Sequence, residues 1–322
     1  MKVRMLVLLD ILHELTDEEH IMNSQSLLAE LEKRGHSSDR RSVYRDVEAL
    51  TEYGFDVVTT SKGFYLRNRR FTLAEVMLLI SAVQAAPFVT ESKTLGLMEK
   101  LTGFLSVYQR EGIRSASNIG GVKFGNEEVY RTIEMINYGI AAKKTISFQY
   151  YKRSIMRRDV VQRRGKRYLV SPYAMVWVQD RYYLIANMDG KEGLIHFRLD
   201  RIRDVRVEEA AARPVSEVSS YGDRFDAVDY ASKCLNMFGG EITRITLRCH
   251  MDLLNELFDR FGEDIPVKKD GDDHFIARIE VAASEGFINW VCQYGSKVEV
   301  VSPENVRGSV KERLKEAAAL YE

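Results

Sequence analysis

Residues 37–46, SSDRRSVYRD, decide how the N-terminal part of this chain is interpreted. In a helix from Ser38 to about Tyr53, each residue advances by about 100°, which separates an apolar stripe from a charged one. The apolar stripe consists of Val43, Val47 and Leu50, and the charged stripe of Arg41, Arg45, Glu48 and Glu52. Ser38 is placed to cap the helix, and the cations occupy its first two turns. Such a helix is suited to approach phosphates and base edges with its N-terminal end.

The flanking sequence predicts two further helices and a hairpin. Apolar spacing indicates helices over Lys2–Leu15 and over residues 23–33, and Gly35 ends the second one. After Gly54, two short runs, 55–60 and 64–66, are joined by a turn with Lys62 at its tip. This order predicts a winged helix-turn-helix over residues 1–70. Its candidate DNA contacts are Ser38, Arg40, Arg41, Ser42, Tyr44, Arg45 and Lys62.

Charge in this segment is clustered although its total nearly cancels. One basic group comprises Lys33, Arg34, Arg40, Arg41 and Arg45, and a second comprises Lys62, Arg67, Arg69 and Arg70. Many helices with two exposed arginines bind nothing, so any DNA affinity must come from this local clustering. The stretch SSDRRSVYRDVEAL, followed by a hairpin ending in GFYL, resembles the DeoR-type winged helix of bacterial WYL-type transcriptional regulators.

Composition indicates an ordinary soluble protein of two or three domains, because 45% of its 322 residues are hydrophobic and 29% are charged. No apolar run approaches the roughly 20 residues of a membrane span, and no cleavage site follows the first apolar stretch. We therefore expect a cytoplasmic protein without a membrane partner. The three cysteines, Cys234, Cys249 and Cys292, show no metal-ligand spacing and are expected to be core thiols.

Residues 71–125 are expected to form a helical linker. Thr72 and Glu75 make a T-x-x-E capping box, a second helix is expected from about Ser92 to Tyr108, and residues 112–125 are rich in glycine and polar residues. These helices could transmit a signal, pair two subunits, or simply space the domains.

Beyond residue 126 the pattern predicts one helix to Ala142 and then five strands. The strands are expected at 145–151, 168–179, 181–188, 194–202 and 205–208. One helix followed by five short strands favours a small Sm-like (SH3-like) β-barrel over residues 126–210. The segment SPYAMVWVQDRYYLIA, followed by HFRLDRI, resembles the WYL domain, with Tyr182 where the family usually has tryptophan.

The barrel segment also carries the most basic stretch of the chain. Residues 141–170 contain ten Lys or Arg and one acid, Asp159, with Tyr150, Tyr151 and Tyr168 among them. Phosphate neutralisation plus flat rings suits a single-stranded nucleic acid or a nucleotide, whereas an ordinary solvated loop is the alternative. The WYL resemblance implies an anionic effector. The candidate contacts are Tyr150, Ser171, Tyr173, Tyr182, His196, Arg198 and Arg201.

The C-terminal part is expected to be a further domain. After a polar linker over residues 211–239, residues 240–322 show the order β-α-β-β-α-β with one extra helix, which is typical of a ferredoxin-like module. It resembles the C-terminal WCX-type extension of WYL regulators, with Trp290, Val291 and Cys292 at the corresponding position. Residues 252–285 hold more acids than bases, which favours dimerisation or closure over the barrel's ligand rather than nucleic-acid binding.

Enzyme signatures are absent from the sequence: no P-loop, G-x-G-x-x-G after a strand, H-E-x-x-H or G-x-S-x-G occurs, and the histidines have no ligand spacing. No catalytic residue, metal or cofactor is therefore expected. The α+β chain is interpreted as a homodimeric regulator that binds double-stranded promoter DNA and whose barrel senses an anionic effector. The alternative is an accessory protein that binds RNA or single-stranded DNA, in which Arg157 and Arg158 carry the binding.

Overall fold

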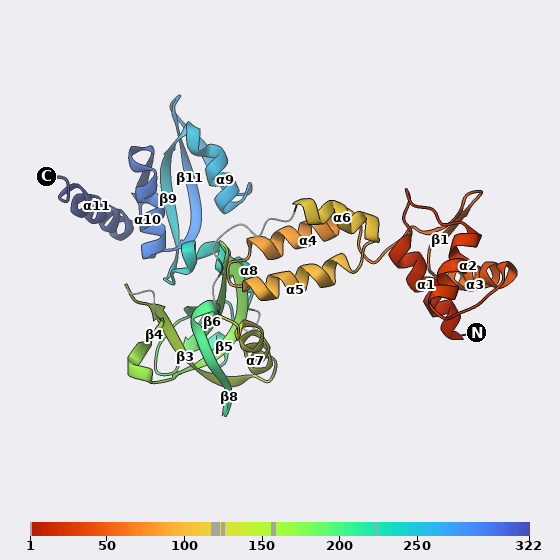
Figure 1. Ribbon diagram of the computed structural model, residues 1–322. Helices are drawn as coiled ribbons and strands as arrows, with labels where there is room; N and C mark the ends of the chain where they lie inside the picture. The colour runs from red at the N-terminus through yellow and green to blue at the C-terminus, as the bar shows by residue number, and fades with distance from the viewer. Residues whose placement is uncertain (1, 117–122, 124–125, 156–158, 223–224) are drawn as a thin grey trace. The chain divides into compact units, whose positions relative to one another are not determined.

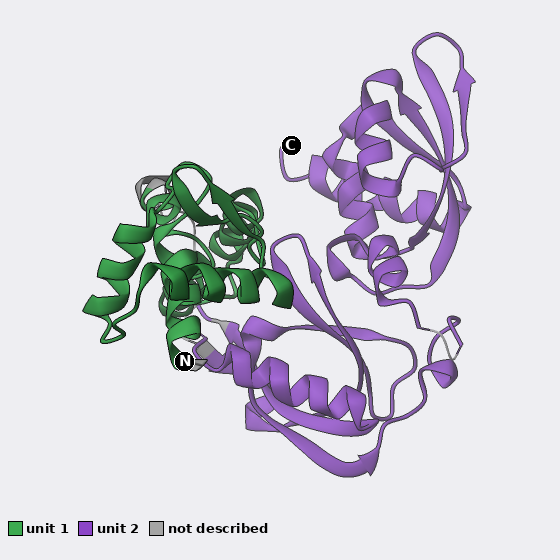
Figure 2. Ribbon diagram, turned by 90° about the vertical axis from the view of Figure 1, so that its right-hand side faces the viewer, with its two compact units in different colours: residues 1–125 green, residues 126–322 purple. Residues whose placement is uncertain are grey.

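The structure is a computed structural model that describes residues 2–116, 123, 126–155, 159–222 and 225–322. The chain is α+β, and its sheets are antiparallel. It divides into two compact units, residues 1–125 and residues 126–322 (Figures 1 and 2). The finer division into five parts stays a prediction.

Unit 1 begins with three helices and a hairpin, in the predicted order. The elements are α1 (Lys2–Leu15), α2 (Ser24–Lys33), α3 (Arg40–Tyr53), β1 (Val57–Thr60) and β2 (Gly63–Leu66). Their apolar stripes meet in one core that contains Leu12, Leu31, Val47 and Phe64. The prediction that Ser38 caps α3 was wrong. The adjacent Asp39 is the cap, because its carboxylate accepts a hydrogen bond from the amide of Ser42 at 3.0 Å.

The hairpin is fixed to the chain just before α2. Met22 and Phe64 exchange backbone hydrogen bonds of 3.0 and 2.8 Å, so β2 has a further short neighbour on its other side. Gly63 makes this approach possible: its φ is +141°, and a Cβ there would lie 2.2 Å from the carbonyl oxygen of Met22. Glycine is the residue that tolerates both conditions.

Three helices follow the hairpin, where two were predicted. They are α4 (Leu73–Ala85), α5 (Glu91–Thr102) and α6 (Val107–Ala116). The Thr72–Glu75 capping box is present. The single helix predicted over Ser92–Tyr108 was wrong, because Ser106 starts a new helix: its hydroxyl accepts from the amide of Gln109, and the Gln109 side chain accepts from the amide of Ser106, both at 3.2 Å. Most of the predicted polar stretch 112–125 lies outside the described residues.

Unit 2 starts with α7 (Val129–Ala141) and a curved sheet. The sheet consists of β3 (Lys144–Arg153), β4 (Asp159–Val161), β5 (Tyr168–Val178), β6 (Arg181–Met188), β7 (Ile195–Arg198) and β8 (Ile202–Ala211). Its order is β4-β3-β5-β6-β7, and β8 also pairs with β3. The expectation of five strands was wrong, because a further strand, β4, pairs with the end of β3. Helix α7 contributes Ile136 to a core with Ile146, Phe148 and Leu184.

The segment predicted as a polar linker is folded against the sheet. It contains α8 (Ala227–Lys233), and Tyr230, Ala231, Cys234 and Met237 are buried in one cluster with Val176 and Ile185 of the sheet. Aromatic residues within a polar sequence explain the error: the rings of Tyr221, Phe225 and Tyr230 contact one another edge to face or tilted.

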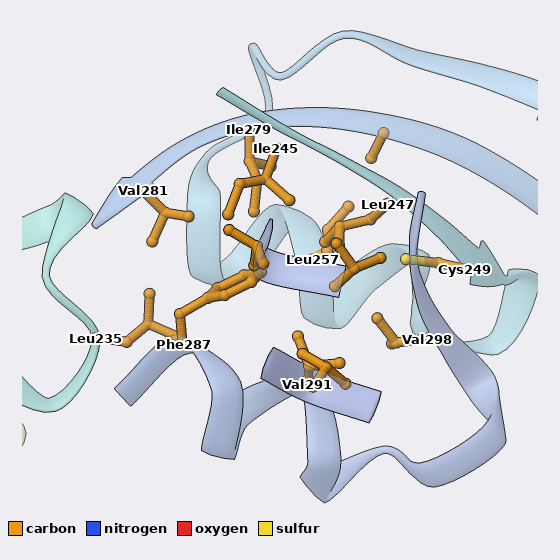
Figure 3. Packing of buried hydrophobic residues seen from close by; sticks show 14 of the residues in the cluster. Leu235, Ile245, Leu247, Cys249, Leu257, Ile279, Val281, Phe287, Val291 and Val298 are labelled. Carbon is orange, nitrogen blue, oxygen red and sulfur yellow. The ribbon is translucent and has the colours of Figure 1, made fainter. Parts of the chain in front are cut away.

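The C-terminal part has the predicted order of elements. They are β9 (Ile242–His250), α9 (Leu254–Phe261), β10 (Val267–Asp270), β11 (His274–Ala282), α10 (Glu285–Gln293), β12 (Val298–Ser302) and α11 (Glu304–Ala318). The sheet order is β10-β11-β9-β12. Figure 3 shows Ile245, Leu247, Ile279, Phe287 and Val291 pointing into the core between the sheet and the helices.

The three cysteines are reduced, and the described residues meet neither the requirements of a metal site nor those of a membrane-spanning helix. Cys234 and Cys249 are buried free thiols and Cys292 is half-buried, and burial raises the pKa of Cys249 to about 11. Among the described residues no group of histidines, cysteines and acids could hold a metal ion. Within those same residues, no helix has the length and apolar character needed to cross a bilayer.

Candidate DNA-facing helix and sensor site

Helix α3 is anchored to the rest of the head through its carboxylates. Asp39 accepts from the amide and, at 2.7 Å, from the hydroxyl of Ser42, and these bonds hold the pKa of Asp39 below its usual value. Asp46 is buried and pairs with Arg4 of α1 at 2.8 Å. Ser42 was predicted to contact DNA, but it is buried and its hydroxyl is used by the cap. The stretch SSDRRSVYRD therefore contains residues that fix α3 in the head as well as residues on its surface.

The opposite face of α3 is exposed. Arg40, Arg41, Tyr44 and Arg45 all lie on the surface, and within the described residues neither Arg41 nor Arg45 forms an ion pair. The Tyr44 ring is 42% exposed, and its edge packs against the ring of Phe64 at 5.0 Å. The Arg40 guanidinium lies 5.6 Å from the centre of the Tyr44 ring. Tyr44 therefore connects the arginine face of α3 to the hairpin.

Some of the other cations in the two predicted basic groups form ion pairs or hydrogen bonds within the protein, and others do not. Lys33 pairs with Glu30, Arg34 with Glu14, and Arg67 with Asp56, each at 2.8 or 2.9 Å. Arg69 donates to the carbonyl oxygens of His13 and Thr16, and burial lowers its pKa. Lys62 is exposed at the hairpin tip, where its amide donates to the Thr60 hydroxyl at 3.2 Å. Among the described residues of these groups, the exposed cations without an ion pair are thus Arg40, Arg41, Arg45, Lys62 and Arg70.

A polar cluster that the sequence did not indicate joins the head to α6. Asp17 is buried, and its carboxylate accepts from the hydroxyl of Ser106 at 2.5 Å and lies 2.7 Å from Nδ1 of His20. The His20 ring stacks on Tyr108 at 3.7 Å. Burial favours the neutral acid, but the bonds from Ser106 and His20 outweigh it and lower the pKa of Asp17. No sequence spacing indicates this contact, because the residues are about ninety positions apart.

In unit 2 the predicted effector residues lie at three separate places. At the end of β7, Arg198 binds Asp200 through two hydrogen bonds of 3.0 and 2.8 Å. Burial disfavours the Arg198 charge, but Asp200 outweighs burial and raises the pKa of Arg198. The Tyr150 hydroxyl accepts from the backbone amide of Arg198 at 3.1 Å, and burial raises the pKa of Tyr150. Arg198 and Tyr150 are therefore part of one bonded group.

Arg201 lies beside this group with its charge open. It is partly exposed, and within the described residues its guanidinium has no hydrogen bond or ion pair. Its charge acts on both Tyr150 and Tyr183. Tyr182 is partly buried against the barrel core, next to the same end of the sheet. We call Tyr150, Tyr182, Arg198 and Arg201 the barrel-end cluster.

His196 bonds to residues outside the barrel-end cluster. Its Nδ1 lies 2.7 Å from the carbonyl oxygen of Met237, and its Nε2 lies 3.0 Å from the hydroxyl of Tyr230. Burial lowers the pKa of His196 below its ordinary value of 6.5, so the ring is neutral near pH 7. Both nitrogens thus hold the segment after β8 to the sheet.

Ser171 and Tyr173 form the third group, on β5. The Ser171 hydroxyl accepts from the amide of Arg213 at 2.9 Å, and the Tyr173 hydroxyl donates to the Arg213 carbonyl at 2.9 Å. Both side chains therefore fix the chain that leaves β8. The structure does not bring Ser171, Tyr173 or His196 together with the barrel-end cluster.

In the described part of the basic stretch, Arg167 is bonded, whereas Arg163 and Arg164 are exposed. Arg167 donates to the backbone and hydroxyl oxygens of Ser147 and pairs with Asp204. Arg163 and Arg164 are exposed in left-handed conformations, with φ of 53° and 54°. The Arg163 guanidinium lies 4.3 Å from the centre of the Tyr168 ring, a cation–π contact. Arg157 and Arg158, which the alternative function invokes, lie outside the described residues.

Two domain models match this chain. Residues 131–207 match the WYL domain, and residues 241–318 match the WCX domain. The first match covers α7 and the curved sheet, and the second covers the C-terminal sheet and its helices. Both matches agree with the resemblance that the sequence shows in SPYAMVWVQDRYYLIA and around Trp290.

Similar proteins include a curated relative and two solved structures. "Uncharacterized HTH-type transcriptional regulator YobV" of Bacillus subtilis (strain 168) is 21% identical over 299 residues, which are 88% of this chain and 90% of that protein. "Proteasome accessory factor B/C (PafBC)" of Arthrobacter aurescens is 18% identical with a TM-score of 0.31; the match covers 100% of this chain and 49% of that one. A "CRISPR Cas-related protein" is 14% identical with a TM-score of 0.37, covering 91% and 77%. The chain therefore contains a WYL domain followed by a WCX domain.

Proposed function

We propose that this protein is a DNA-binding transcriptional regulator that binds double-stranded promoter DNA through α3. In this proposal residues 1–70 are a winged helix-turn-helix, the WYL domain is an Sm-like barrel, and the WCX domain is ferredoxin-like. The protein acts as a homodimer in the cytoplasm and is not an enzyme. The relative from Bacillus subtilis, described as an HTH-type transcriptional regulator, supports the DNA-binding assignment.

The observation that carries the proposal is the free arginine face of α3. The capping carboxylate Asp39 and the buried Asp46 are both bonded within the head, so neither neutralises Arg41 or Arg45. These two arginines occupy the first turns of the helix, where recognition helices contact base edges. Lys62 at the hairpin tip is available for the flanking groove or the backbone. In a dimer, two such helices would contact half-sites about one DNA turn apart.

A selection of genomic duplex fragments followed by gel shifts tests this function. Arg41→Ala combined with Arg45→Ala should weaken duplex binding by at least about 30-fold, because each arginine that contacts a base contributes about 1–3 kcal/mol. Arg67→Ala is the matched control, because Arg67 is exposed but paired with Asp56. Equal binding by the double variant and the control would rule out α3 as the recognition helix.

The barrel-end cluster is the proposed sensor site. Arg198 is compensated by Asp200, whereas the charge of Arg201 is open, so the cluster retains one positive charge for an anion. Tyr150 and Tyr182 supply rings next to that charge. The hypothesised mechanism is that the effector shifts the relative populations of head spacings and thereby changes operator affinity.

A short single-stranded oligonucleotide and a mononucleotide are suitable probes for the sensor. Either probe should change duplex binding by the wild type, and Arg201→Ala should abolish that response without changing duplex affinity in the absence of probe. Arg206→Ala is the control, because Arg206 is an exposed arginine that pairs with Asp204. A response that survives Arg201→Ala and Arg198→Ala would exclude the cluster as the sensor.

The exposed pair Arg163 and Arg164 supports the alternative, single-strand binding without promoter specificity. Both cations are exposed, and Arg163 is held over the ring of Tyr168, whose side chain belongs to the buried core. Binding only to single strands, lost in Arg163→Ala with Arg164→Ala, would favour this alternative over the regulator.

A further inference from the structure

The C-terminal part of unit 2 contains a cavity that the proposed function does not use. Its volume is about 700 Å³, and it lies where α8, the end of α9 and the strands β9 and β11 approach one another. Its lining includes the apolar residues Phe261, Ile265 and Pro266. It also includes the cations Lys233, Arg244, Arg260 and Arg278. We call this cavity the Arg260 pocket.

Arg260 is the unusual residue of the pocket. Its Nη2 atom is buried, and it has no hydrogen-bond partner in the part of the chain that the structure describes. The guanidinium carbon lies 5.7 Å from the centre of the Phe261 ring. Burial lowers the pKa of Arg260. Arg260 is half-buried as a whole, and holding a charge partly out of water without an anionic partner costs free energy that a bound anion would offset.

Two of the three acidic residues that line the pocket bond to residues other than Arg260 and Arg278. Asp229 accepts from the hydroxyl of Tyr221 at 2.5 Å and from the ammonium of Lys233 at 2.8 Å. Glu280 accepts from Nε of Arg244 at 2.9 Å. Asp264, at the rim, is exposed. The lining residues therefore leave the charges of Arg260 and Arg278 uncompensated by close ion pairs in the described chain.

We propose that the Arg260 pocket binds a small organic acid, namely a carboxylate attached to an apolar body. The planar guanidinium matches a carboxylate through paired hydrogen bonds, and Phe261, Ile265 and Pro266 cover the apolar part of the ligand. The acids at the rim disfavour a doubly charged phosphate. A volume of about 700 Å³ lies within the usual range of small-molecule sites. The pocket is thus a second ligand site, separate from the barrel-end cluster.

Calorimetric titration of the full-length protein with 3-phenylpropionate tests the proposal. We expect saturable binding that 3-phenylpropionamide, which has no charge, and inorganic phosphate, which has no apolar body, do not reproduce. Arg260→Gln should weaken binding by about tenfold or more, because a charge-assisted bidentate contact is lost. Arg248→Gln is the matched control: Arg248 lies on the same sheet, paired with Asp270 and outside the pocket.

Thermal unfolding provides a second readout, because a purely structural arginine would behave differently. Removing an unpaired buried charge should leave the melting temperature of Arg260→Gln unchanged or higher, whereas a structural role predicts a lower one. Absent 3-phenylpropionate binding, equal binding by Arg260→Gln and the wild type, or binding of phosphate alone would each overturn the proposal. The titration contains no DNA, so its failure would not affect the proposed regulator.

Discussion

Helix α3 and the end of β7 both present arginines that the sequence assigns to ligands, yet their surroundings differ. On α3 the carboxylates bond to the scaffold, Asp39 to Ser42 and Asp46 to Arg4, and they leave Arg41 and Arg45 open. At the end of β7 the nearby carboxylate, Asp200, bonds to Arg198 itself. The same residue types therefore serve different purposes depending on which partner the fold supplies.

The largest expected effect on stability comes from a carboxylate of α3 that anchors the helix to the rest of the head. Asp46→Ala leaves Arg4 mostly buried without its anion and should lower the free energy of unfolding by about 2 kcal/mol. Urea denaturation measures this change. Asp56→Ala breaks the more exposed pair with Arg67 and should cost less than about 1 kcal/mol. Equal losses would show that the buried pair does not anchor the helix.

The next largest effect on stability is expected at His196, where the experiment distinguishes a structural histidine from a ligand contact. His196→Gln disturbs the hydrogen bonds to Met237 and Tyr230 and should cost about 1–2 kcal/mol of unfolding free energy. If His196 instead served only the effector, this variant would keep its stability and lose effector binding.

Acidification sharpens the test of His196. Its pKa is lowered by burial, so above pH 6.5 both folded and unfolded states hold the ring neutral and its contribution is complete. As the pH falls below 6.5, His196 is protonated in the unfolded state before it is protonated in the folded state, so stability decreases. The stability gap between wild type and His196→Gln should therefore shrink from about pH 7.5 to about pH 5.5. His13, whose pKa burial also lowers, is present in both proteins and cancels. A constant gap would contradict the neutral, buried ring.

The smallest expected effects on stability concern the barrel-end cluster. Tyr150→Phe removes the acceptor of the Arg198 amide and should cost about 1 kcal/mol, whereas Arg201→Ala should change stability by less than about 0.5 kcal/mol. Thermal melts of both variants give the comparison. A larger loss in Arg201→Ala than in Tyr150→Phe would mean that Arg201 has a structural partner rather than an open charge.

The sequence predicted the elements well because their periodicity is local. The stripes of α3, the hairpin turn and the β-α-β-β-α-β order all depend on neighbouring residues, and the structure has them. The cap was misplaced by one residue, because Ser38 and Asp39 are both good caps and only the geometry distinguishes them. Strand β4 was missed because it is three residues long.

The site was predicted less well because partners are distant in sequence. His196 was predicted to contact the effector, but its partners Tyr230 and Met237 come from a segment interpreted as a linker. Ser171 and Tyr173 were likewise assigned to a ligand, and instead they bond to Arg213 about forty residues later. A residue's face follows from its spacing, whereas its hydrogen-bond partner follows from the tertiary fold.

The salt dependence of duplex DNA binding tests most directly whether the two arginine surfaces serve different purposes. Each cation that neutralises a phosphate releases counterions, and the N-terminal end of α3 approaches phosphates as well as base edges in this account, so replacing Arg41 and Arg45 by alanine should reduce the slope of log affinity against log salt by about one to two. Arg201→Ala should leave the wild-type slope unchanged. An unaltered slope in the α3 variant, together with a reduced slope in Arg201→Ala, would contradict the account.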